Sequence, residues 1–404
     1  MKQDVCFDWW QRNDLCYQNG DLIFAGRNVS SLAAQFGSPS FVYSAKRFIE
    51  NLNRVKSSLD EAGFKNRHTL YYAMKANRFA PLLTYLKLSG LCGIDACSPN
   101  EVEHAVSCGF EPSEISFTAT SLSQDDFDML ARYKGLFMDC DSITAIHNWG
   151  KRQSGGEIGI RINPSLGLGR SDNDMLQYSG ERTTKFGIYI EQFEDALKVA
   201  KSYGLKVTKI HFHSGCGYLD SELAQLKSII ERSKVFLALA KDVKRINIGG
   251  GLGVPLLPTD KHLNLKKWAS LVYELFGDLD IHLEVEPGAY IANDAGLLLL
   301  TKTFLEKKQD TLFLGVNAGF NIAPEPAYYA LPFQPIPFHY NSERLHPVTV
   351  VGNINEALDV WYKDAYLPDM THHDGLVLIN AGAYSSSMAS NHCMRGQYKE
   401  FLLM

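Results

Sequence analysis

The sequence lacks a strong excess of either charge and any long hydrophobic run. Its 404 residues carry a formal net charge of only -5, so charge does not favour nucleic acid or a membrane surface as a main partner. The opening residues contain no apolar stretch typical of a signal peptide. Apolar runs elsewhere, such as residues 296–300, are far too short to span a bilayer. We therefore expect a soluble, cytoplasmic protein.

Paired cysteines are also missing. The eight cysteines never occur in a Cys-x-x-Cys spacing, so their pattern predicts neither a disulfide framework nor a zinc site. They are Cys6, Cys16, Cys92, Cys97, Cys108, Cys140, Cys216 and Cys393. We expect reduced thiols and no bound metal.

The sequence does contain a long alternation of short apolar runs with helix-like segments, over residues 41–290. Strand alternating with helix indicates βα units and a parallel sheet, and about eight such repeats predict a closed, TIM-like (β/α)8 barrel. In such barrels the chemistry lies at the C-terminal ends of the strands. A chain of this length, with 45% hydrophobic residues, can also bury the core of a second domain.

The second domain is predicted over residues 291–404, where prolines become frequent and strand-like runs replace long helical periodicity. This pattern indicates an all-β domain. The N-terminal segment, residues 1–40, includes the strand-like stretch "GDLIFAG" at 20–26 and is predicted to join it. The class is therefore α/β, with a barrel followed by a C-terminal β domain.

One lysine ends an apolar run in "LYYAMKANRF", residues 70–79. A lysine at the end of a buried strand most often extends its stem along apolar surface toward water. The alternative is that Lys75 is a Schiff-base lysine, whose amine is kept partly neutral by a hydrophobic wall.

Three further motifs have both a structural and a chemical interpretation. Residues 249–251 in "INIGGGLG" are a turn or a phosphate cradle of bare backbone. His211 and His213 alternate on a strand, so one is expected to face into the barrel and the other away. By default each is a core histidine, but an inward ring could lie flat on a planar cofactor. Glu286 is an ion-pair member or holds a proton on a heterocyclic nitrogen.

Together with Lys75, these groups supply what pyridoxal phosphate requires: an aldehyde anchor, a phosphate cradle, a ring support and a partner for the ring nitrogen. The stretches "YYAMKAN", "HFHSGCG", "INIGGGLG", "EPGAY" and "INAGAYSSSMASNH" occur in order along the chain. With them the sequence resembles the barrel-type (fold type III) pyridoxal-phosphate decarboxylases, the diaminopimelate and ornithine decarboxylase group. The resemblance implies an alanine racemase-like fold and head-to-tail homodimers, whose active sites are completed by the partner's C-terminal domain.

The resemblance also implies a role for each matched residue. Lys75 would bond to the cofactor aldehyde, His213 would stack on the ring, and Glu286 would pair with the ring nitrogen. Asp95 and Arg161 would support the site, although a purely structural role is the alternative for both. The residues implied in phosphate binding are Gly249, Gly250, Gly251, Cys216 and Tyr384.

Departures from the family pattern occur in the second domain. Relatives carry a cysteine acid where this chain has Asn355, within "GNINEALD", so the final proton is expected from Lys75, His213 or water. Glu356 and Asp359 of the same segment are kept as predicted substrate contacts. Glu325 stands near the position where diaminopimelate decarboxylases place an arginine for the distal carboxylate, which argues against diaminopimelate as substrate.

The stretches "GNINEALDVWYKD" and "SNHCMRGQYKEFLL" resemble the decarboxylases of citrate-based siderophore pathways, of the staphyloferrin B and vibrioferrin type. That resemblance implies decarboxylation of a citryl-amino acid, with positive charge from His392 and Arg395 and a further contact from Tyr329. The alternative for Arg395 is an ordinary surface arginine. Alternative functions are decarboxylation of free diaminopimelate, lysine or ornithine, a pyridoxal-phosphate-dependent racemase, and a non-catalytic regulatory homologue.

Overall fold

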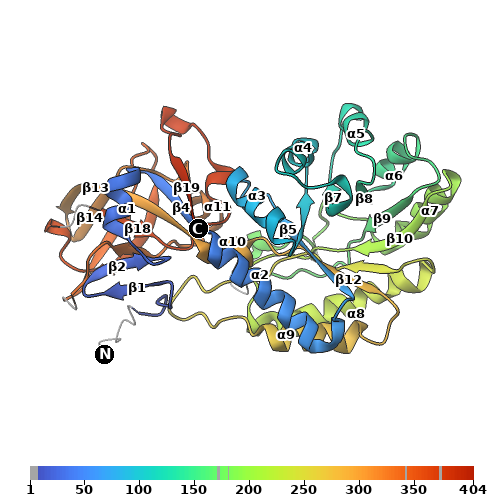
Figure 1. Ribbon diagram of the computed structural model, residues 1–404, viewed down its shortest axis with the longest axis horizontal. Helices are drawn as coiled ribbons and strands as arrows, with labels where there is room; N and C mark the ends of the chain where they lie inside the picture. Colours follow the sequence, from blue (N-terminus) through green and yellow to red (C-terminus); the bar gives the residue numbers. More distant parts are fainter. Residues whose placement is uncertain (1–7, 171–172, 181, 342–343, 373–374) are drawn as a thin grey trace. The chain divides into compact units, whose positions relative to one another are not determined.

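The structure is a computed structural model that describes residues 8–170, 173–180, 182–341, 344–372 and 375–404 (Figure 1). Cys6 lies outside these residues. The chain divides into two compact units, which we describe separately. The barrel unit comprises Asn51–Gly253 and His262–Tyr290, and the β unit comprises Met1–Glu50, Val254–Lys261 and Ile291–Met404.

Eight parallel strands close into a barrel in the barrel unit, with the order β10-β11-β12-β5-β6-β7-β8-β9. The strands are β5 (His68–Ala73), β6 (Gly93–Ala96), β7 (Ile115–Ala119), β8 (Phe137–Cys140), β9 (Glu157–Arg161), β10 (Lys206–His211), β11 (Arg245–Asn247) and β12 (His282–Val285). This arrangement confirms the predicted fold class.

Helices alternate with the barrel strands and cover the outside of the barrel (Figure 1), and the first of them, α2, begins in the β unit and precedes β5. Several begin at polar caps, such as Ser98, whose side chain accepts a hydrogen bond from the Glu101 amide. The long helix α9 buries Leu265, Trp268 and Val272 along one side, as an amphipathic helix on a sheet must. The helices are α2 (Ala45–Leu59), α3 (Ala80–Ser89), α4 (Pro99–Ser107), α5 (Gln124–Leu130), α6 (Ile143–Gly150), α7 (Ile190–Ser202), α8 (Leu223–Leu239), α9 (Leu265–Phe276) and α10 (Ala289–Ala292). None of the helices within the described residues is long and apolar enough to cross a membrane.

The β unit is built on a large sheet, in which β15, β18, β13, β14, β16 and β17 are neighbours in that order and β4 pairs with β13 and β19. Its strands are β4 (Ser40–Ser44), β13 (Gly296–Lys308), β14 (Thr311–Val316), β15 (Pro335–Pro337), β16 (His346–Val351), β17 (Val360–Leu367), β18 (Gly375–Leu378) and β19 (Lys399–Leu403). Two short helices, α1 (Val29–Phe36) and α11 (Glu325–Tyr329), interrupt the strands.

The N-terminal segment contributes a three-stranded sheet to the β unit, formed by β1 (Leu15–Gln18), β2 (Asp21–Phe24) and β3 (Arg27–Asn28). Trp10 and Phe24 share a hydrophobic core with Leu297 and Val377 of the large sheet. One predicted element is wrong: residues 41–43, expected to open the barrel, lie in β4 of the β unit. Because β4 is buried along its whole length, its sequence has the same apolar texture as a barrel strand.

Candidate active site

Lys75 lies two residues beyond the C-terminal end of β5, at the predicted mouth of the barrel. Its Nζ is 3.9 Å from Asp95 Oδ2 of β6 and donates a hydrogen bond to Cys97 Sγ at 3.5 Å. The side chain is 42% exposed, while Met74 and Ala76 on either side are buried. The amine therefore lies beside a carboxyl group and a thiol, and it is exposed enough for a ligand to reach it.

The two groups beside Lys75, Asp95 and Cys97, have raised pKa values. Burial, reinforced by the negative charge of Glu286, raises the pKa of Asp95 to about 7, although Lys75 opposes this shift. Burial also raises the pKa of Cys97 to about 12. The thiol therefore keeps its proton at neutral pH.

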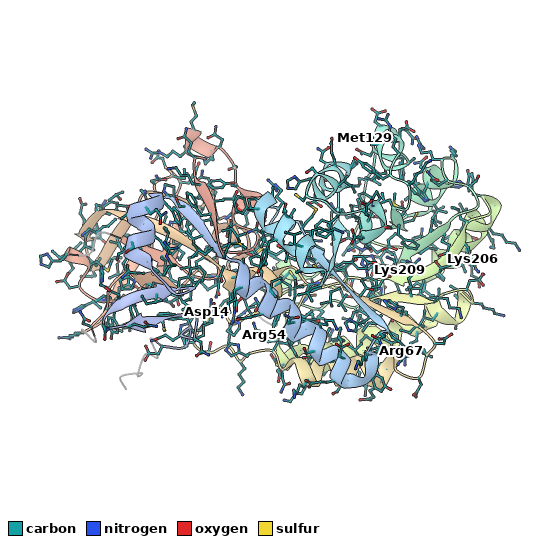
Figure 2. The ribbon with its side chains drawn as sticks, in the orientation of Figure 1. Asp14, Arg54, Arg67, Met129, Lys206 and Lys209 are labelled. Carbon is teal, nitrogen blue, oxygen red and sulfur yellow. The ribbon has the colours of Figure 1, made fainter. Side chains whose placement is uncertain are left out.

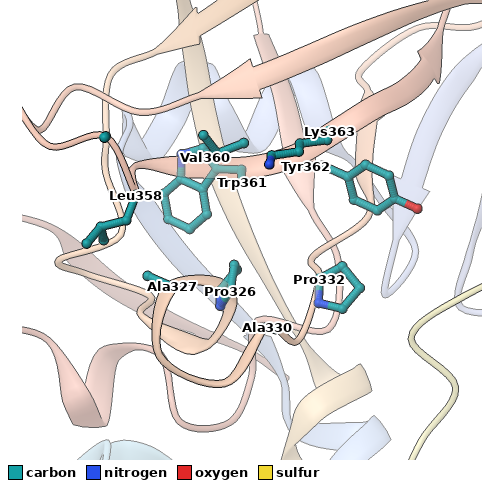
Figure 3. A pocket seen from close by; sticks show the side chains of 10 residues that line it. Pro326, Ala327, Ala330, Pro332, Leu358, Val360, Trp361, Tyr362 and Lys363 are labelled. Carbon is teal, nitrogen blue, oxygen red and sulfur yellow. The ribbon is translucent and has the colours of Figure 1, made fainter. Parts of the chain in front are cut away.

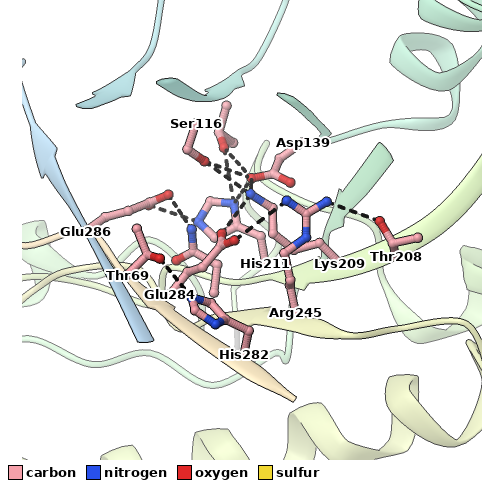
Figure 4. Close-up of polar contacts among 12 residues, drawn as sticks. Thr69, Ser116, Asp139, Thr208, Lys209, His211, Arg245, His282, Glu284 and Glu286 are labelled. Carbon is pink, nitrogen blue, oxygen red and sulfur yellow. Dashed lines mark hydrogen bonds and ion pairs between the residues drawn. The ribbon is translucent and has the colours of Figure 1, made fainter. Parts of the chain in front are cut away.

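Glu286 follows β12 and is buried, with a neighbour at each carboxylate oxygen (Figure 4). Asn247 Nδ2 donates a 2.6 Å hydrogen bond to Oε1, and His211 Nε2 lies 3.1 Å from Oε2. Burial raises the pKa of Glu286, while the charges of Lys209 and Lys75 lower it. The Asn247 amide thus holds the carboxyl group near the strand ends, and the His211 ring lies beside it without a hydrogen bond.

The two histidines do not point to opposite faces, so that expectation is wrong. Residues two apart on a strand share a face, so the spacing of His211 and His213 does not favour opposite faces, and β10 also ends at His211. His211 contacts Glu286, whereas His213 Nδ1 accepts a 3.3 Å hydrogen bond from the Gly250 amide, and its ring packs against Tyr178. Burial lowers the pKa of His213 well below its usual value, so its ring is neutral.

The glycine segment after β11 has room for no side chain. A Cβ on Gly250 would lie 2.2 Å from the Glu286 carbonyl oxygen, and one on Gly251 would lie 2.3 Å from the Gly215 carbonyl oxygen. Gly251 also has a positive φ of 94°. Among the described residues, the buried Gly251 amide makes no hydrogen bond, so it can serve an anion.

The remaining predicted barrel residues lie nearby in sequence or on neighbouring strands. Arg161 ends β9 and is buried, with its guanidinium 4.7 Å from the centre of the Phe186 ring. Cys216 is half-buried, and its amide donates to the Leu176 carbonyl. Sequence reasoning passed over Ser214, whose buried hydroxyl has no hydrogen bond among the residues that the structure describes.

A buried charged network lies inside the barrel, and sequence reasoning missed it (Figure 4). Lys209 Nζ is 2.7 Å from Asp139 Oδ2 and 3.0 Å from Glu284 Oε2, and all three side chains are almost fully buried. Lys206, on the same strand, is by contrast exposed (Figure 2). Residues i and i+2 of a strand lie on the same face, so Lys209 and His211 share one face of β10. This spacing of polar residues in a buried strand is the signal that could have predicted the network.

Asp139, His211 and Glu286 bring potential metal ligands within 4.8 Å of one another. The Lys209 ammonium already occupies the position of a cation beside Asp139. We therefore assign no metal to this cluster.

The predicted substrate residues all lie in the β unit. Asn355, Glu356 and Arg395 are exposed, and His392 Nε2 lies 3.3 Å from Glu356 Oε1. Asp359 is instead buried.

The Asp359 carboxylate accepts hydrogen bonds from the Phe320 and Ile354 amides, at 2.7 and 2.6 Å. These bonds give Asp359 a structural role in its loop, so its predicted contact with substrate has no support in the structure.

Three other residues of the β unit bear on the site. Tyr384 is half-buried with a positive φ of 51°, and Tyr329 ends α11. Glu325, at the start of α11, is buried, and burial raises its pKa to about 8. Because the two units are described separately, the predicted contacts of these residues with the barrel site stay predictions.

A cavity of about 470 Å³ opens between α11 and β17 in the β unit (Figure 3). Its walls are mostly apolar, with Pro332 and Trp361 among them. No predicted site residue lines it.

Comparison with known proteins assigns the class. Residues 45–293 match the family model described as "Pyridoxal-dependent decarboxylase, pyridoxal binding domain". The chain is 31% identical over 399 residues to diaminopimelate decarboxylase of Methanothermobacter thermautotrophicus, covering 95% of this chain and 91% of the relative. It is 30% identical over 394 residues to that of Helicobacter pylori, covering 93% of each.

Solved structures agree with these relatives. A variant of the H. pylori diaminopimelate decarboxylase, in complex with L-lysine, has a TM-score of 0.84 at 25% identity and covers 93% of this chain and 94% of that one. The M. jannaschii enzyme has a TM-score of 0.87 at 23% identity, covering 97% and 93%, which supports the fold alone. The chain belongs to the pyridoxal-dependent decarboxylases. It is a pyridoxal-phosphate-dependent carboxy-lyase.

The residues present fit this cofactor. The glycine segment has no space for a side chain, and the buried Gly251 amide has no hydrogen bond within the described residues; both features suit a phosphate. The Lys75 amine suits an aldehyde, and the oriented carboxyl of Glu286 suits a ring nitrogen.

Proposed function

We propose that the chain removes the α-carboxylate of a free amino acid whose side chain ends in an amine, such as lysine or ornithine. The observation that carries the reaction is the convergence of Lys75, Asp95, His213 and Glu286 at the ends of the barrel strands. Whole-length similarity to diaminopimelate decarboxylases supports a free amino acid over a conjugate.

In this proposal, bound pyridoxal phosphate supplies an electron sink for the electron pair that remains when CO2 leaves. The Lys75 amine would hold the cofactor at its aldehyde. Glu286 keeps a proton at the ring nitrogen, and His213 supports the ring. Asn355 is not an acid, so Lys75 returns the proton to the α-carbon.

The buried carboxyl of Glu325 supports the amine at the distal end. In the described part of the chain, burial alone shifts the pKa of Glu325, with no contribution from a cation or a hydrogen-bond donor. An ammonium that binds beside this carboxyl would lower its pKa, so that the carboxyl ionises and pairs with the amine, whereas a second carboxylate would raise the pKa further. Diaminopimelate, which ends in both groups, is therefore expected to react more slowly than lysine.

A citryl-amino acid is the second candidate. It is supported by His392 and Arg395, which are exposed and can meet a carboxylate-rich substrate. We also propose that the active enzyme is a head-to-tail homodimer, whose β units bring Tyr384, Tyr329 and the substrate residues to the partner's barrel. If monomers of the protein show no decarboxylase activity, that result would support the proposed homodimer.

The test is a CO2-release screen of the loaded enzyme with lysine, ornithine, diaminopimelate and citryl-amino acids. We expect lysine or ornithine to react fastest, and Lys75→Ala to lose both CO2 release and the visible absorbance of bound cofactor. Full activity of that variant would contradict the proposed reaction.

A matched pair of variants tests the substrate. Glu325→Arg is expected to shift the preference from lysine toward diaminopimelate, whereas Glu325→Gln weakens lysine turnover without that reversal. Turnover of diaminopimelate alone by the unchanged enzyme would refute the amine-ended substrate, and turnover of only the conjugates would favour the second candidate.

A further inference from the structure

A serine, a histidine and an aspartate from the two ends of the sequence meet in the β unit. Ser30 Oγ lies 3.0 Å from His339 Nε2, and His339 Nδ1 lies 2.6 Å from Asp21 Oδ1. Ser30 is in the first turn of α1, Asp21 opens β2, and His339 lies two residues beyond β15. The proposed decarboxylation uses none of the three. Contacts that run from hydroxyl to imidazole to carboxylate are those of many acyl-transfer enzymes.

Backbone pairing holds His339 opposite Asp21. The two residues form an antiparallel β-bridge, and backbone hydrogen bonds of 2.9 and 2.8 Å join their neighbours on either side. The second carboxylate oxygen of Asp21 accepts a 3.0 Å hydrogen bond from Asn28 Nδ2, and Asn28 Oδ1 accepts one from the Ser31 amide. Asn28 therefore links this carboxylate to the start of the helix that carries Ser30.

The proton positions follow from these partners. A carboxylate only accepts hydrogen bonds, so His339 Nδ1 carries the ring proton and donates it to Asp21. In the neutral ring Nε2 is then an acceptor, and the Ser30 hydroxyl donates to it. This is the tautomer in which a histidine can take the proton of a serine hydroxyl.

A donor for developing negative charge also lies beside the Ser30 hydroxyl. The Ser30 amide is in the first turn of α1, where a helix offers no acceptor, and it makes no hydrogen bond among the described residues. The backbone amide of a reacting serine is one of the donors that stabilise an oxyanion. The side chains of His339 and Asp21 are 50% and 42% exposed, so small molecules and water can reach the three residues.

We propose that Ser30, His339 and Asp21 form a second reactive centre, which cleaves small activated esters. The Ser30 oxygen bonds to the ester carbonyl carbon while its proton moves to His339 Nε2. The bond between that carbon and the alcohol oxygen then breaks, and the alcohol leaves with the proton. Water, deprotonated by the same nitrogen, hydrolyses the acyl-serine to the acid and restores Ser30. This proposal does not rest on the proposed decarboxylation.

The first test maps covalent labelling of the full, cofactor-loaded protein by a fluorophosphonate, which reacts with activated serines. We expect digestion and mass spectrometry to find the adduct on Ser30. His339→Asn should slow its formation about 100-fold, a usual contribution of a general base, and Asp21→Asn should slow it less. Ser31→Ala is the matched control, because Ser31 stands in the same helical turn, and this variant should react at the wild-type rate.

Hydrolysis of p-nitrophenyl acetate measures turnover. We expect Ser30→Ala to fall to the rate of the unfolded chain while it still binds pyridoxal phosphate, and Lys75→Ala to hydrolyse the ester at the wild-type rate. Labelling no faster than in the unfolded chain, an adduct on another serine with Ser30 unmodified, or an unchanged rate in His339→Asn would overturn the proposal. If a variant does not fold, the label map of the wild type decides.

Discussion

The buried carboxyl groups of the barrel network and the buried Glu325 of the β unit differ in whether a neighbouring group compensates them. In the barrel, Asp139 and Glu284 share the Lys209 ammonium, and Glu286 has an amide and an imidazole beside it. In the β unit, burial alone raises the pKa of Glu325, and no cation within the described residues compensates it. A compensated group maintains the fold, whereas an uncompensated one is costly and therefore marks a place where a ligand can supply the missing charge.

The largest expected effect on stability comes from removing the cation that compensates the buried carboxyl groups of the barrel. Lys209→Met removes the cation that Asp139 and Glu284 share and leaves only Arg245, 3.9 Å from Glu284. Breaking a buried pair in this way typically costs about 3–5 kcal/mol of unfolding free energy. Denaturant unfolding of the variant measures the loss. The triple variant with Asp139→Asn and Glu284→Gln should recover much of it, and a loss below about 1 kcal/mol would show that the network is not needed for stability.

The second largest effect is expected at Glu325, the buried carboxyl group that no cation compensates, and it concerns how stability depends on pH. The pKa of Glu325 is raised from 4.5 to about 8, so the folded state binds this proton more tightly than the unfolded state. Its contribution to stability is complete below about pH 4.5 and is lost as the pH rises to about 8, on the order of a few kcal/mol. Glu325→Gln should be less sensitive to pH over that window in thermal or denaturant unfolding. Identical pH profiles for the two proteins would contradict the unpaired state of Glu325.

The smallest effect on stability is expected from an exposed ion pair. This pair is the control for the buried groups of both units. Lys198 and Asp195 lie 2.7 Å apart, with side chains 73% and 67% exposed. Because water and salt screen such a pair, Asp195→Asn should unfold at the same denaturant concentration as the wild type. A clear shift would mean that burial is not what separates these groups from Lys209.

The sequence predicted the functional residues that stand next to a recognisable strand. Lys75, His213, Glu286 and residues 249–251 each stand at a strand end that apolar runs mark, so the mouth of the barrel could be predicted. The network around Lys209 could not, because Asp139 and Glu284 come from strands distant in sequence that meet only when the barrel closes.

Two further differences have physical causes. The strand β4 resembles a barrel strand because it is buried on both faces, and only pairing with β13 and β19 places it in the β unit. The expected opposite orientation of His211 and His213 fails because residues two apart on a strand share a face.

The most direct test of the account is to locate the cofactor on the chain. The purified protein, loaded with pyridoxal phosphate, is reduced with borohydride, digested and analysed by mass spectrometry. We predict that the reduced cofactor is carried by Lys75 and by no other lysine. A cofactor adduct on a different lysine, with Lys75 unmodified, would contradict the site described here.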